Sequence, residues 1–557
     1  MRALHIKALR DLWHLRSQAL AIALVIAAGL ANLVMSRATL ESLSETRQRF
    51  YDDHAFADVF AQARRVPEAV AERIREIDGV QAVETRLVSG ANLSVPGFEE
   101  PVRALMVSLP DSGEPLLNRP YLRAGRLLAP GREDEAVISE AFAEAHGFAP
   151  GDTLSATIYG RQRELRIVGI ALSPEYVYQI QPGTVFPDFR RFAIVWMNRR
   201  ALEAALDMDG AFNNVTLKRA ARTRSEAAIA AVDEVLAPYG GLGAYDREDQ
   251  VSNRFLSEEL RQLDTMARIF PTIFLGVAAF LLNVVISRLV GMQRDQIAIL
   301  KAFGYSNLAI GLHYAVLVAL IVGVGVVVGL LGGVRLGHWM AGVYQDFYRF
   351  PFLEFTMSPG VFALGVGVSL LAAFVGTAHA VVAAARLPPA EAMRPPAPER
   401  YRPALFERLG LSRVLSQPTR MVLRHLERRP WKSLLSVIGL AFACAIMMMG
   451  RFQTDAIDYM IDVQFRIGQR NDLSADFTEA AGPSAAHELR ALPGVRHVEP
   501  YRNVPVMLRH GLHRERNAIQ GLAHDSVLKR PVNRDLQRAP IPGEGLLLTD
   551  YLAEQLG

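Results

Sequence analysis

The residues of this sequence that could act as acids, bases or nucleophiles lack the spacing that catalysis or metal binding requires. Asp111, Asp134 and His146 lie in one long polar segment, where no nucleophile, base and orienting group recur at the spacing of an active site. No His-x-x-x-His pair occurs, and the single cysteine, Cys444, excludes a thiolate cluster and an internal disulfide. We interpret the three residues as solvated surface and expect no catalytic residue, metal or cofactor.

A different kind of chemistry, the binding of a partner, is indicated by MQRDQIAILKAFGYS at 292–306. On a helical wheel Met292, Ile299, Leu300 and Phe303 share one side, and the cations Arg294 and Lys301 point away from it. Gly304 can end the helix and Ser306 can cap the next one. We expect a helix over 292–303, with candidate binding residues Met292, Arg294, Asp295, Gln296, Ile297, Ile299, Leu300, Lys301, Phe303 and Gly304.

The sequence contains no loop of the type that cradles nucleotide phosphates. The pattern G-x-x-x-x-G-K-[ST] does not occur in the 557 residues. Gly325, Gly329 and Gly333 recur at four-residue intervals inside an apolar run, where small residues favour close helix packing.

Five apolar runs without Asp, Glu, Lys or Arg are long enough to cross a membrane, which takes about 20 helical residues. Half of all residues are hydrophobic. The first run is longer than the apolar core of a signal peptide and lacks a clear cleavage site, so we expect an uncleaved membrane helix. The runs are Ser17–Ser36, Ile269–Ser287, Tyr314–Gly333, Gly360–Ala385 and Ser433–Gly450.

Basic residues beside the apolar runs indicate the topology. The segment 386–432 has ten Arg and one Lys against four Glu, and the N-terminal tail and residues 288–301 are also basic. Short basic segments beside membrane helices stay in the cytoplasm. The net charge of +4 is therefore explained by the topology of a multi-pass inner-membrane protein and does not indicate nucleic-acid binding. The expected order is 1–16 cytoplasmic, 17–36 membrane, 37–268 outer domain with stalk, 269–287 membrane, 288–313 cytoplasmic loop, 314–333 membrane, 334–359 outer loop, 360–385 membrane, 386–432 cytoplasmic linker rich in Arg and Pro, 433–450 membrane and 451–557 a second outer domain.

A cytoplasmic helix over 292–303 has two sensible uses. It can lie on the inner leaflet, or it can occupy a groove on a soluble partner. The membrane surface would favour more cations and a bulky aromatic residue, so the partner is the better interpretation.

The chain contains an internal repeat. LRDLWHLRSQALAIAL from Leu9 aligns with LRHLERRPWKSLLSVI from Leu423, an offset of 414, and IDGVQAVE from Ile77 aligns with LPGVRHVE from Leu492. AVISEAFAEAHG at 136–147 aligns with LLLTDYLAEQLG at 546–557. Because the first copy continues well beyond residue 147, we expect an incomplete second module in a fragment of a longer protein.

The outer domain is predicted to be α+β. We expect a helix over 66–80, strands over 81–95, 103–109 and 136–139, and a helix over 140–147 that Gly147 ends. The runs TLSATIY and RELRIVGI flank Gly160–Arg161 and predict a hairpin.

Three stretches resemble the FtsX-like, MacB-type permease family of ABC transporters. RDQIAILKAFGYS is similar to the family's cytoplasmic loop, ARLPPAEAMRP (385–395) to the arm after its fourth crossing, and residues 125–170 to its periplasmic core domain. The resemblance implies an α-helical transmembrane protein with an α+β MacB-like periplasmic core domain. The family's usual Glu in the loop is Gln296 here, which puts an ion pair at that position in doubt.

The resemblance also implies a function, that of a permease subunit without ATPase activity of its own. A separate ABC-type ATP-binding subunit would dock on 292–303, and the stalk 249–270 would carry the motion to the outer domain. The stalk residues that could pack against a counterpart are Val251, Phe255, Leu263, Met266 and Phe270. Export or lipoprotein-type extrusion is the expected output, with a periplasmic adaptor or membrane-fusion protein as a further candidate partner. The alternative is a mechanotransmission protein that transports nothing and regulates a periplasmic enzyme; the missing catalytic spacing argues against a membrane-anchored enzyme.

Overall fold

The computed structural model describes residues 2–111, 114–181, 184, 186–220, 223–388, 416–428, 430–477, 481–511 and 513–557. Most of the predicted linker 386–432, including most of the 385–395 arm, lies outside these residues. The chain divides into a helical unit (Met1–Glu45, Glu259–Tyr344, Leu353–Gln453) and a second unit (Thr46–Glu258, Gln345–Phe352, Thr454–Gly557). We call Thr46–Glu258 the sheet domain.

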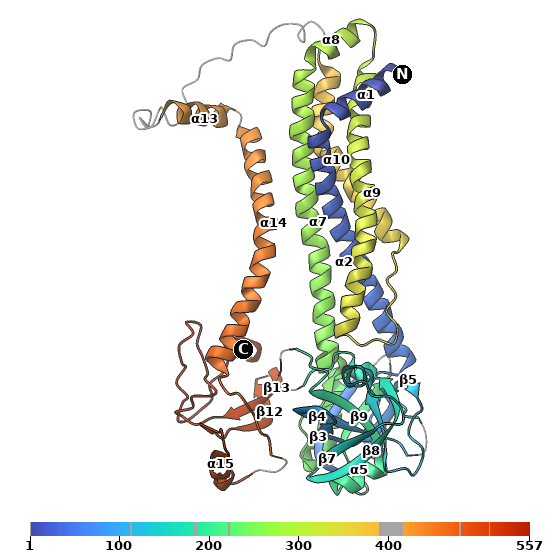
Figure 1. Cartoon of the computed structure of the whole chain (residues 1–557), viewed down its shortest axis with the longest axis vertical. Helices are drawn as coiled ribbons and strands as arrows, with labels where there is room; N and C mark the ends of the chain where they lie inside the picture. Colours follow the sequence, from blue (N-terminus) through green and yellow to red (C-terminus); the bar gives the residue numbers. More distant parts are fainter. Residues whose placement is uncertain are drawn as a thin grey trace. The chain divides into compact units, whose positions relative to one another are not determined.

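Long helices account for most of the helical unit (Figure 1). The longer ones are α1 (Arg2–His14), α2 (Arg16–Asp53), α7 (Val251–Met292), α9 (Asn307–Phe347), α10 (Pro359–Arg386), α13 (Gln417–Arg428) and α14 (Pro430–Asp462), and the short α8 (Arg294–Ala302) follows α7. A π-helical turn over Val463–Gly468 continues α14.

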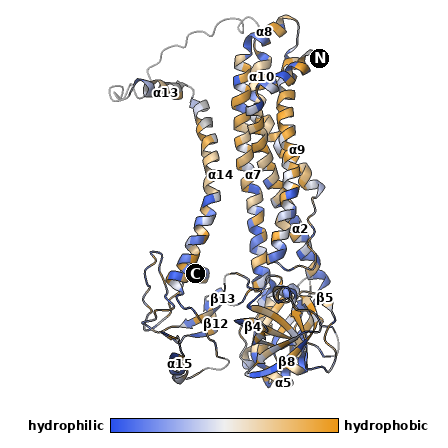
Figure 2. Ribbon diagram, viewed as in Figure 1, coloured by the Kyte–Doolittle hydropathy of each residue, from blue (hydrophilic) through white to orange (hydrophobic). Residues whose placement is uncertain are grey.

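Among the described residues, five helical segments are long and apolar enough to span a membrane, which confirms the predicted fold class. They are Arg16–Asp53, Val251–Met292, Asn307–Phe347, Pro359–Arg386 and Val437–Gly468. Hydrophobic residues cover only part of each helix, and the lower stretches of α7 and α14 in the view are largely hydrophilic (Figure 2). The helices are longer than the predicted apolar runs because their polar ends continue beyond a membrane core of about 30 Å.

Helices α2, α7, α9 and α10 run side by side and share one apolar core (Figure 1). Gly325, Gly329 and Gly333 of α9 face α2 at close range, as their spacing predicts. A Cβ atom at Gly325 would lie 2.9 Å from the carbonyl oxygen of Ala23, and one at Gly333 would lie 3.0 Å from that of Ala31. The glycines therefore bring the two backbones together, which larger residues would prevent.

The sheet domain contains two sheets. The smaller sheet has the order β11-β1-β10-β2, and α3 and α6 pack on it. The larger has the order β5-β8-β6-β9-β4-β3-β7, and β7 also pairs with β8, so six of its strands form a closed ring. Closure leaves those strands without free edges, and apolar side chains such as Phe142, Ile167 and Val195 form the core packed on this sheet.

The elements of the sheet domain and of the C-terminal segment are as follows. The strands are β1 (Val59–Pro67), β2 (Val80–Arg86), β3 (Val88–Val95), β4 (Phe98–Leu109), β5 (Tyr121–Gly125), β6 (Glu135–Ser139), β7 (Thr153–Ile158), β8 (Arg161–Leu172), β9 (Phe192–Asn198), β10 (Ala211–Arg219), β11 (Tyr245–Asp246), β12 (Arg502–His510) and β13 (His513–Gly521). The helices are α3 (Val70–Arg75), α4 (Glu140–His146), α5 (Arg199–Leu206), α6 (Ser225–Leu236), α15 (Pro483–Arg490) and α16 (Asp550–Leu556), with short 3-10 turns at Pro174–Tyr176, Ala237–Tyr239 and Arg247–Asp249.

Two local predictions differ from the structure. The single strand expected over 81–95 is two strands, because the chain passes from the smaller sheet to the larger one at the buried Leu87. The helix expected over 66–80 is only α3, and β1 occupies the residues before it. By contrast, the predicted hairpin is present between β7 and β8, but its turn is Tyr159–Gly160, both at positive φ, one residue before the expected Gly160–Arg161.

The repeat extends to the order of elements. Helices α13 and α14 follow one another as α1 and α2 do, at the offset of 414 that the sequence gives. The β3–β4 hairpin closes with Val95 opposite Phe98, and the β12–β13 hairpin closes with His510 opposite His513, each 415 residues later. Part of the order of secondary structure, the short helix before the long one and the later β-hairpin, therefore occurs twice among the described residues.

A buried ion pair joins the two sheets of the sheet domain. Arg86 at the end of β2 donates from both Nη atoms to the carboxylate of Glu175 at 2.6 Å, and from Nε to Asn214 Oδ1 of β10 at 2.7 Å. Both charged side chains are more than nine-tenths buried. Burial alone would lower the pKa of Arg86, but the carboxylate of Glu175 outweighs that effect and raises the pKa.

Replacing one member of this pair is expected to destabilise the sheet domain strongly. Glu175→Leu leaves the guanidinium of Arg86 buried without a counter-ion, which costs about 3–5 kcal/mol. Urea unfolding of the full chain in detergent, followed by the fluorescence of the buried Trp196, measures the loss. Glu72→Ala is the control, since its pair with Arg75 is exposed and contributes at most about 1 kcal/mol. Equal losses in the two variants would contradict this role of the buried pair.

Candidate functional site

Helix α8 forms most of the segment singled out in the sequence. It runs from Arg294 to Ala302, and Phe303 follows it as the C-terminal cap residue. Gly304 has φ +88°, and the hydroxyl of Ser306 accepts a hydrogen bond from the backbone N–H of Ala309 at 3.2 Å, as the sequence predicts.

The start of the helix differs from the expectation of 292. Met292 is the last residue of α7, and Gln293 stands alone between α7 and α8 with φ −98° and ψ 15°. The junction is therefore a break between two helices, and the side chain of Gln293 makes hydrogen bonds that stabilise this break.

The two faces of α8 have different surroundings. Ile297 and Ala298 are buried, and Ile297 belongs to the apolar core that α2, α7, α9 and α10 share. On the opposite side Met292, Ile299 and Phe303 are exposed by 62%, 45% and 79%. We call these three residues the apolar face of α8; nothing in the described part of the chain covers it.

Leu300 and the polar candidate residues lie outside the apolar face of α8. Leu300 is half-buried instead of sharing the open face, and it lines a small pocket. Arg294 is half-buried, while Asp295 and Gln296 are exposed. The pocket lies between α1, α8 and α9 and is lined by Leu4, Lys7, Gln296, Ile297, Leu300, Ile310, His313 and Tyr314.

Lys301 binds the end of α10. Its Nζ donates to the carbonyl oxygens of Ala385 at 2.8 Å and Leu387 at 2.6 Å. A cation at the C-terminus of a helix satisfies carbonyl groups that have no partner within the helix. Partial burial at this position lowers the pKa of Lys301.

Gln293 is the centre of a buried polar cluster that joins α1, α9 and the α7–α8 break. Its Oε1 accepts hydrogen bonds from Lys7 Nζ at 3.0 Å and from the hydroxyl of Tyr314 at 2.9 Å. Lys7 Nζ also contacts Asp11 Oδ2 at 2.5 Å, and His313 Nε2 lies 3.5 Å from the same oxygen. We call Lys7, Asp11, Gln293, His313 and Tyr314 the hinge cluster. Because it is buried, each of its contacts constrains the position of α8.

Sequence reasoning did not identify the hinge cluster. Lys7 and Asp11 have the i, i+4 spacing of a helical ion pair, and His313 and Tyr314 stand together at the start of an apolar run. Both were visible signals of polar contacts between helices. The long-range contact with Gln293 leaves no local pattern.

The residues weighed first as chemical candidates have structural contacts. Asp111 accepts the backbone N–H of Arg200, Asp134 pairs with Arg132, and His146 Nε2 donates to the carbonyl oxygen of Arg190. Within the part of the chain that the structure describes, no three His, Cys, Asp or Glu side chains come together as metal ligands.

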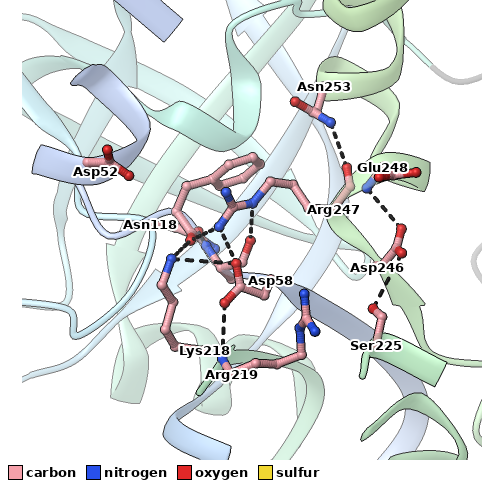
Figure 3. A network of polar contacts seen from close by, with 12 residues as sticks. Asp52, Asp58, Asn118, Lys218, Arg219, Ser225, Asp246, Arg247, Glu248 and Asn253 are labelled. Carbon is pink, nitrogen blue, oxygen red and sulfur yellow. Dashed lines mark hydrogen bonds and ion pairs between the residues drawn. The ribbon is translucent and has the colours of Figure 1, made fainter. Parts of the chain in front are cut away.

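The other end of α7 is held in the sheet domain by Arg247 (Figure 3). Its guanidinium pairs with Asp58 and donates to the carbonyl oxygens of Phe56 at 2.6 Å and Ala57 at 2.9 Å. Asn253 in the first turn of α7 donates to the carbonyl oxygen of Arg247 at 2.8 Å. The start of α7 is thereby fixed to the residues that lead from α2 into β1.

A second set of contacts fixes the start of α7 to the loop that follows β8. Gln250 Nε2 donates to the carbonyl oxygen of Glu175 at 2.7 Å, and the backbone N–H of Tyr178 donates to Ser252 Oγ at 2.8 Å. Since Glu175 also binds Arg86, these contacts connect α7 to both sheets of the sheet domain.

Two family descriptions match this chain. Residues 19–236 match the MacB-like periplasmic core domain, and residues 268–389 match the FtsX-like permease C-terminal family. No curated protein sequence matches the chain. The two matches cover α8, α9, α10 and most of the sheet domain, together with parts of α2 and α7.

Solved structures similar to part of the chain include three outer domains. The extracellular domain of the noncanonic ABC-type transporter YknZ from Gram-positive bacteria is 13% identical with a TM-score of 0.23, over 33% of this chain and 97% of that one. The periplasmic region of MacB from Actinobacillus actinomycetemcomitans is 10% identical with a TM-score of 0.25, over 38% and 95%. A domain of a permease protein from Porphyromonas gingivalis is 16% identical with a TM-score of 0.24, over 36% and 97%.

Removing the amide of Gln293 is expected to loosen α8. Gln293→Leu leaves Lys7 and Tyr314 without their shared acceptor, and each buried hydrogen bond contributes about 0.5–1.5 kcal/mol. Amide hydrogen exchange in α8 and α1 should become roughly 5- to 150-fold faster, while exchange in the sheet domain stays unchanged. Mass spectrometry of the full chain in lipid nanodiscs measures this.

Gln296→Leu is the matched control, because the same substitution on the exposed side of α8 removes no hydrogen bond with Lys7 or Tyr314. Identical exchange in the wild type and in Gln293→Leu would mean that the hinge cluster does not hold α8 in place.

Proposed function

This chain belongs to the FtsX-like permease family and has a MacB-like periplasmic core domain, and we propose that it couples ATP hydrolysis by a separate subunit to movement of that domain. Permeases of this family are membrane components of ABC transporters and work with an ATPase subunit. The observation that carries the proposal is the apolar face of α8, which is open on one side while the hinge cluster and Lys301 tie the other side to α1, α9 and α10.

The apolar face has the properties of a docking surface for a groove in a soluble subunit. Ile299 and Phe303 are four residues apart on one side of α8, and Met292 precedes the break. An aromatic anchor with aliphatic neighbours is typical of helix-in-groove recognition. The sequence has no phosphate-binding loop of the G-x-x-x-x-G-K-[ST] type, so a subunit that docks here would supply the ATP site.

The structure also bears on the other use of α8, binding to the inner leaflet. Lys301 binds carbonyl groups of α10, which leaves Arg294 as the one other cation of α8, and Asp295 is exposed beside it. A helix on an anionic lipid surface typically presents several cations. These contacts favour a protein partner.

The proposed path of the motion is α7. Its C-terminal end adjoins α8 at the hinge cluster, and its N-terminal end is held by Arg247, Gln250 and Ser252 in the sheet domain. A displacement of α8 would reach the α7 backbone directly. The predicted stalk residues Val251, Phe255, Leu263, Met266 and Phe270 all lie in α7, and their packing against a counterpart stays a prediction.

We propose export or lipoprotein-type extrusion as the output, and regulation of a periplasmic enzyme as the alternative. Apolar side chains fill the core packed on the closed sheet, so its interior offers no room for cargo. This favours an output through the outer surface of the domain, by contact with cargo, with an adaptor or with an enzyme.

Charges on the apolar face are expected to abolish docking. The double variant Ile299→Asp with Phe303→Asp would bury two carboxylates in the partner's groove. Loss of buried apolar anchor residues from an interface weakens binding by roughly 30-fold or more. Co-purification with the ATPase encoded beside the gene, and ATP turnover of the complex, measure the effect. Leu300 is left intact because it lines the pocket with α1.

Asp295→Ser is the control on the same helix, because it changes an exposed polar residue outside the apolar face. Unchanged co-purification and unchanged ATP turnover in the doubly charged variant would refute α8 as the docking site.

A further inference from the structure

Helix α1 has an exposed apolar stripe on the side that faces away from the bundle. Leu4 and Ala8 are buried on its inner side, next to Lys7 and Asp11 of the hinge cluster. Ile6, Leu9 and Trp13 are exposed by 68%, 59% and 69%. Positions 6, 9 and 13 share one side of a helix, opposite positions 4 and 8. We call Ile6, Leu9 and Trp13 the outer stripe of α1.

The outer stripe continues along the face of the membrane helix that follows. Only Leu15 separates α1 from α2, and its N–H bonds to the carbonyl oxygen of Asp11 at 3.1 Å while its own carbonyl accepts from Ala19 at 2.8 Å. Leu20 and Leu24 of α2 are exposed by 58% and 54%, at a helical spacing from Trp13. An exposed leucine face on a membrane-spanning helix is in contact with lipid, so the surface that continues into the outer stripe is a lipid surface.

Charged residues beside the stripe suit the lipid headgroups. Arg10 and Arg16 are exposed, and the Arg16 guanidinium lies 5.2 Å from the ring centroid of Trp13. Tryptophan is enriched where a membrane meets water, and arginine next to it can bind headgroup phosphates. Lys7, by contrast, is committed to the hinge cluster.

We propose that α1 is a membrane-surface helix whose outer stripe is buried at the boundary between headgroups and acyl chains, with Arg10 and Arg16 bound to lipid phosphates. Its inner side meanwhile binds Gln293 through Lys7. The lipid surface therefore sets the depth of the α7–α8 break, independently of the ATPase that docks on α8. This goes beyond the proposed function and does not depend on it.

The depth of the outer stripe can be measured on the full chain in lipid nanodiscs. In a Cys444→Ala background, Leu9→Cys carries a nitroxide spin label, and Glu99→Cys on the sheet domain is the water-exposed control. Collision rates with oxygen, which concentrates in lipid, and with a water-soluble nickel chelate report the surroundings of each label. We expect a clearly higher oxygen-to-nickel ratio at position 9 than at position 99.

Two results would overturn the proposal. A ratio at position 9 equal to that at position 99 would place the stripe in water. Low access of both reagents at position 9, whether in the chain alone or after the ATPase subunit is added, would place it in a protein contact.

Placing a charged residue in the outer stripe of α1 provides a second test. Trp13→Glu should shift the label at position 9 toward nickel access, because a carboxylate disfavours burial among lipids. His14→Glu places the same charge on the neighbouring position outside the stripe and should leave the ratio unchanged. An unchanged ratio in Trp13→Glu, or equal shifts in both variants, would show that lipid contact of the stripe does not hold α1.

Discussion

The two hydrogen bonds that the side chain of Gln293 accepts constrain the rest of the helical unit. Polar groups buried in a protein away from water must find hydrogen-bond partners within it. Lys7 and Tyr314 supply them and fix the place where α7 ends and α8 begins. With that break fixed, Ile297 turns inward and Ile299 turns outward, so the chain presents an apolar face that it does not itself cover. This open face is the surface that we propose binds the ATPase subunit.

The ends of α7 are held by the same kind of interaction in two different settings. At one end buried amide, ammonium and hydroxyl groups meet at Gln293, and at the other Arg247 and Gln250 bind backbone carbonyls of the sheet domain. Between them the helix has 42 residues, a length of about 63 Å at 1.5 Å per residue. Pro271 lies inside α7 and removes one backbone hydrogen bond, but the helix is unbroken over this length and resists bending better than a loop would. Fixing both ends by buried hydrogen bonds makes it suited to carry a displacement.

The sequence was most informative where structure depends on neighbours along the chain. The five membrane helices and the Tyr159–Gly160 hairpin follow from local composition and turn chemistry, and both are present. The crossing between sheets at Leu87 and the hinge cluster were missed, because each depends on residues far apart in sequence. For the candidate site, a local pattern located α8 but placed Leu300 on its open side, since a helical wheel contains no information about α1.

The internal repeat keeps the short helix and the long helix of the first copy but not the chemistry of the short helix. At the offset that aligns α1 with α13, Lys7 corresponds to Met421 and Asp11 to His425, so the second copy has no equivalent of that ion pair. Trp13 corresponds to Glu427 and Ile6 to Arg420, while Leu9 corresponds to Leu423, so two of the three residues of the outer stripe are replaced by charged ones. The ion pair and the stripe that we propose to contact lipid are therefore not repeated in full in α13. A short helix precedes a long apolar one in both copies, but the residues of the two short helices differ. The order of helices alone therefore does not imply the same mechanical role for both copies.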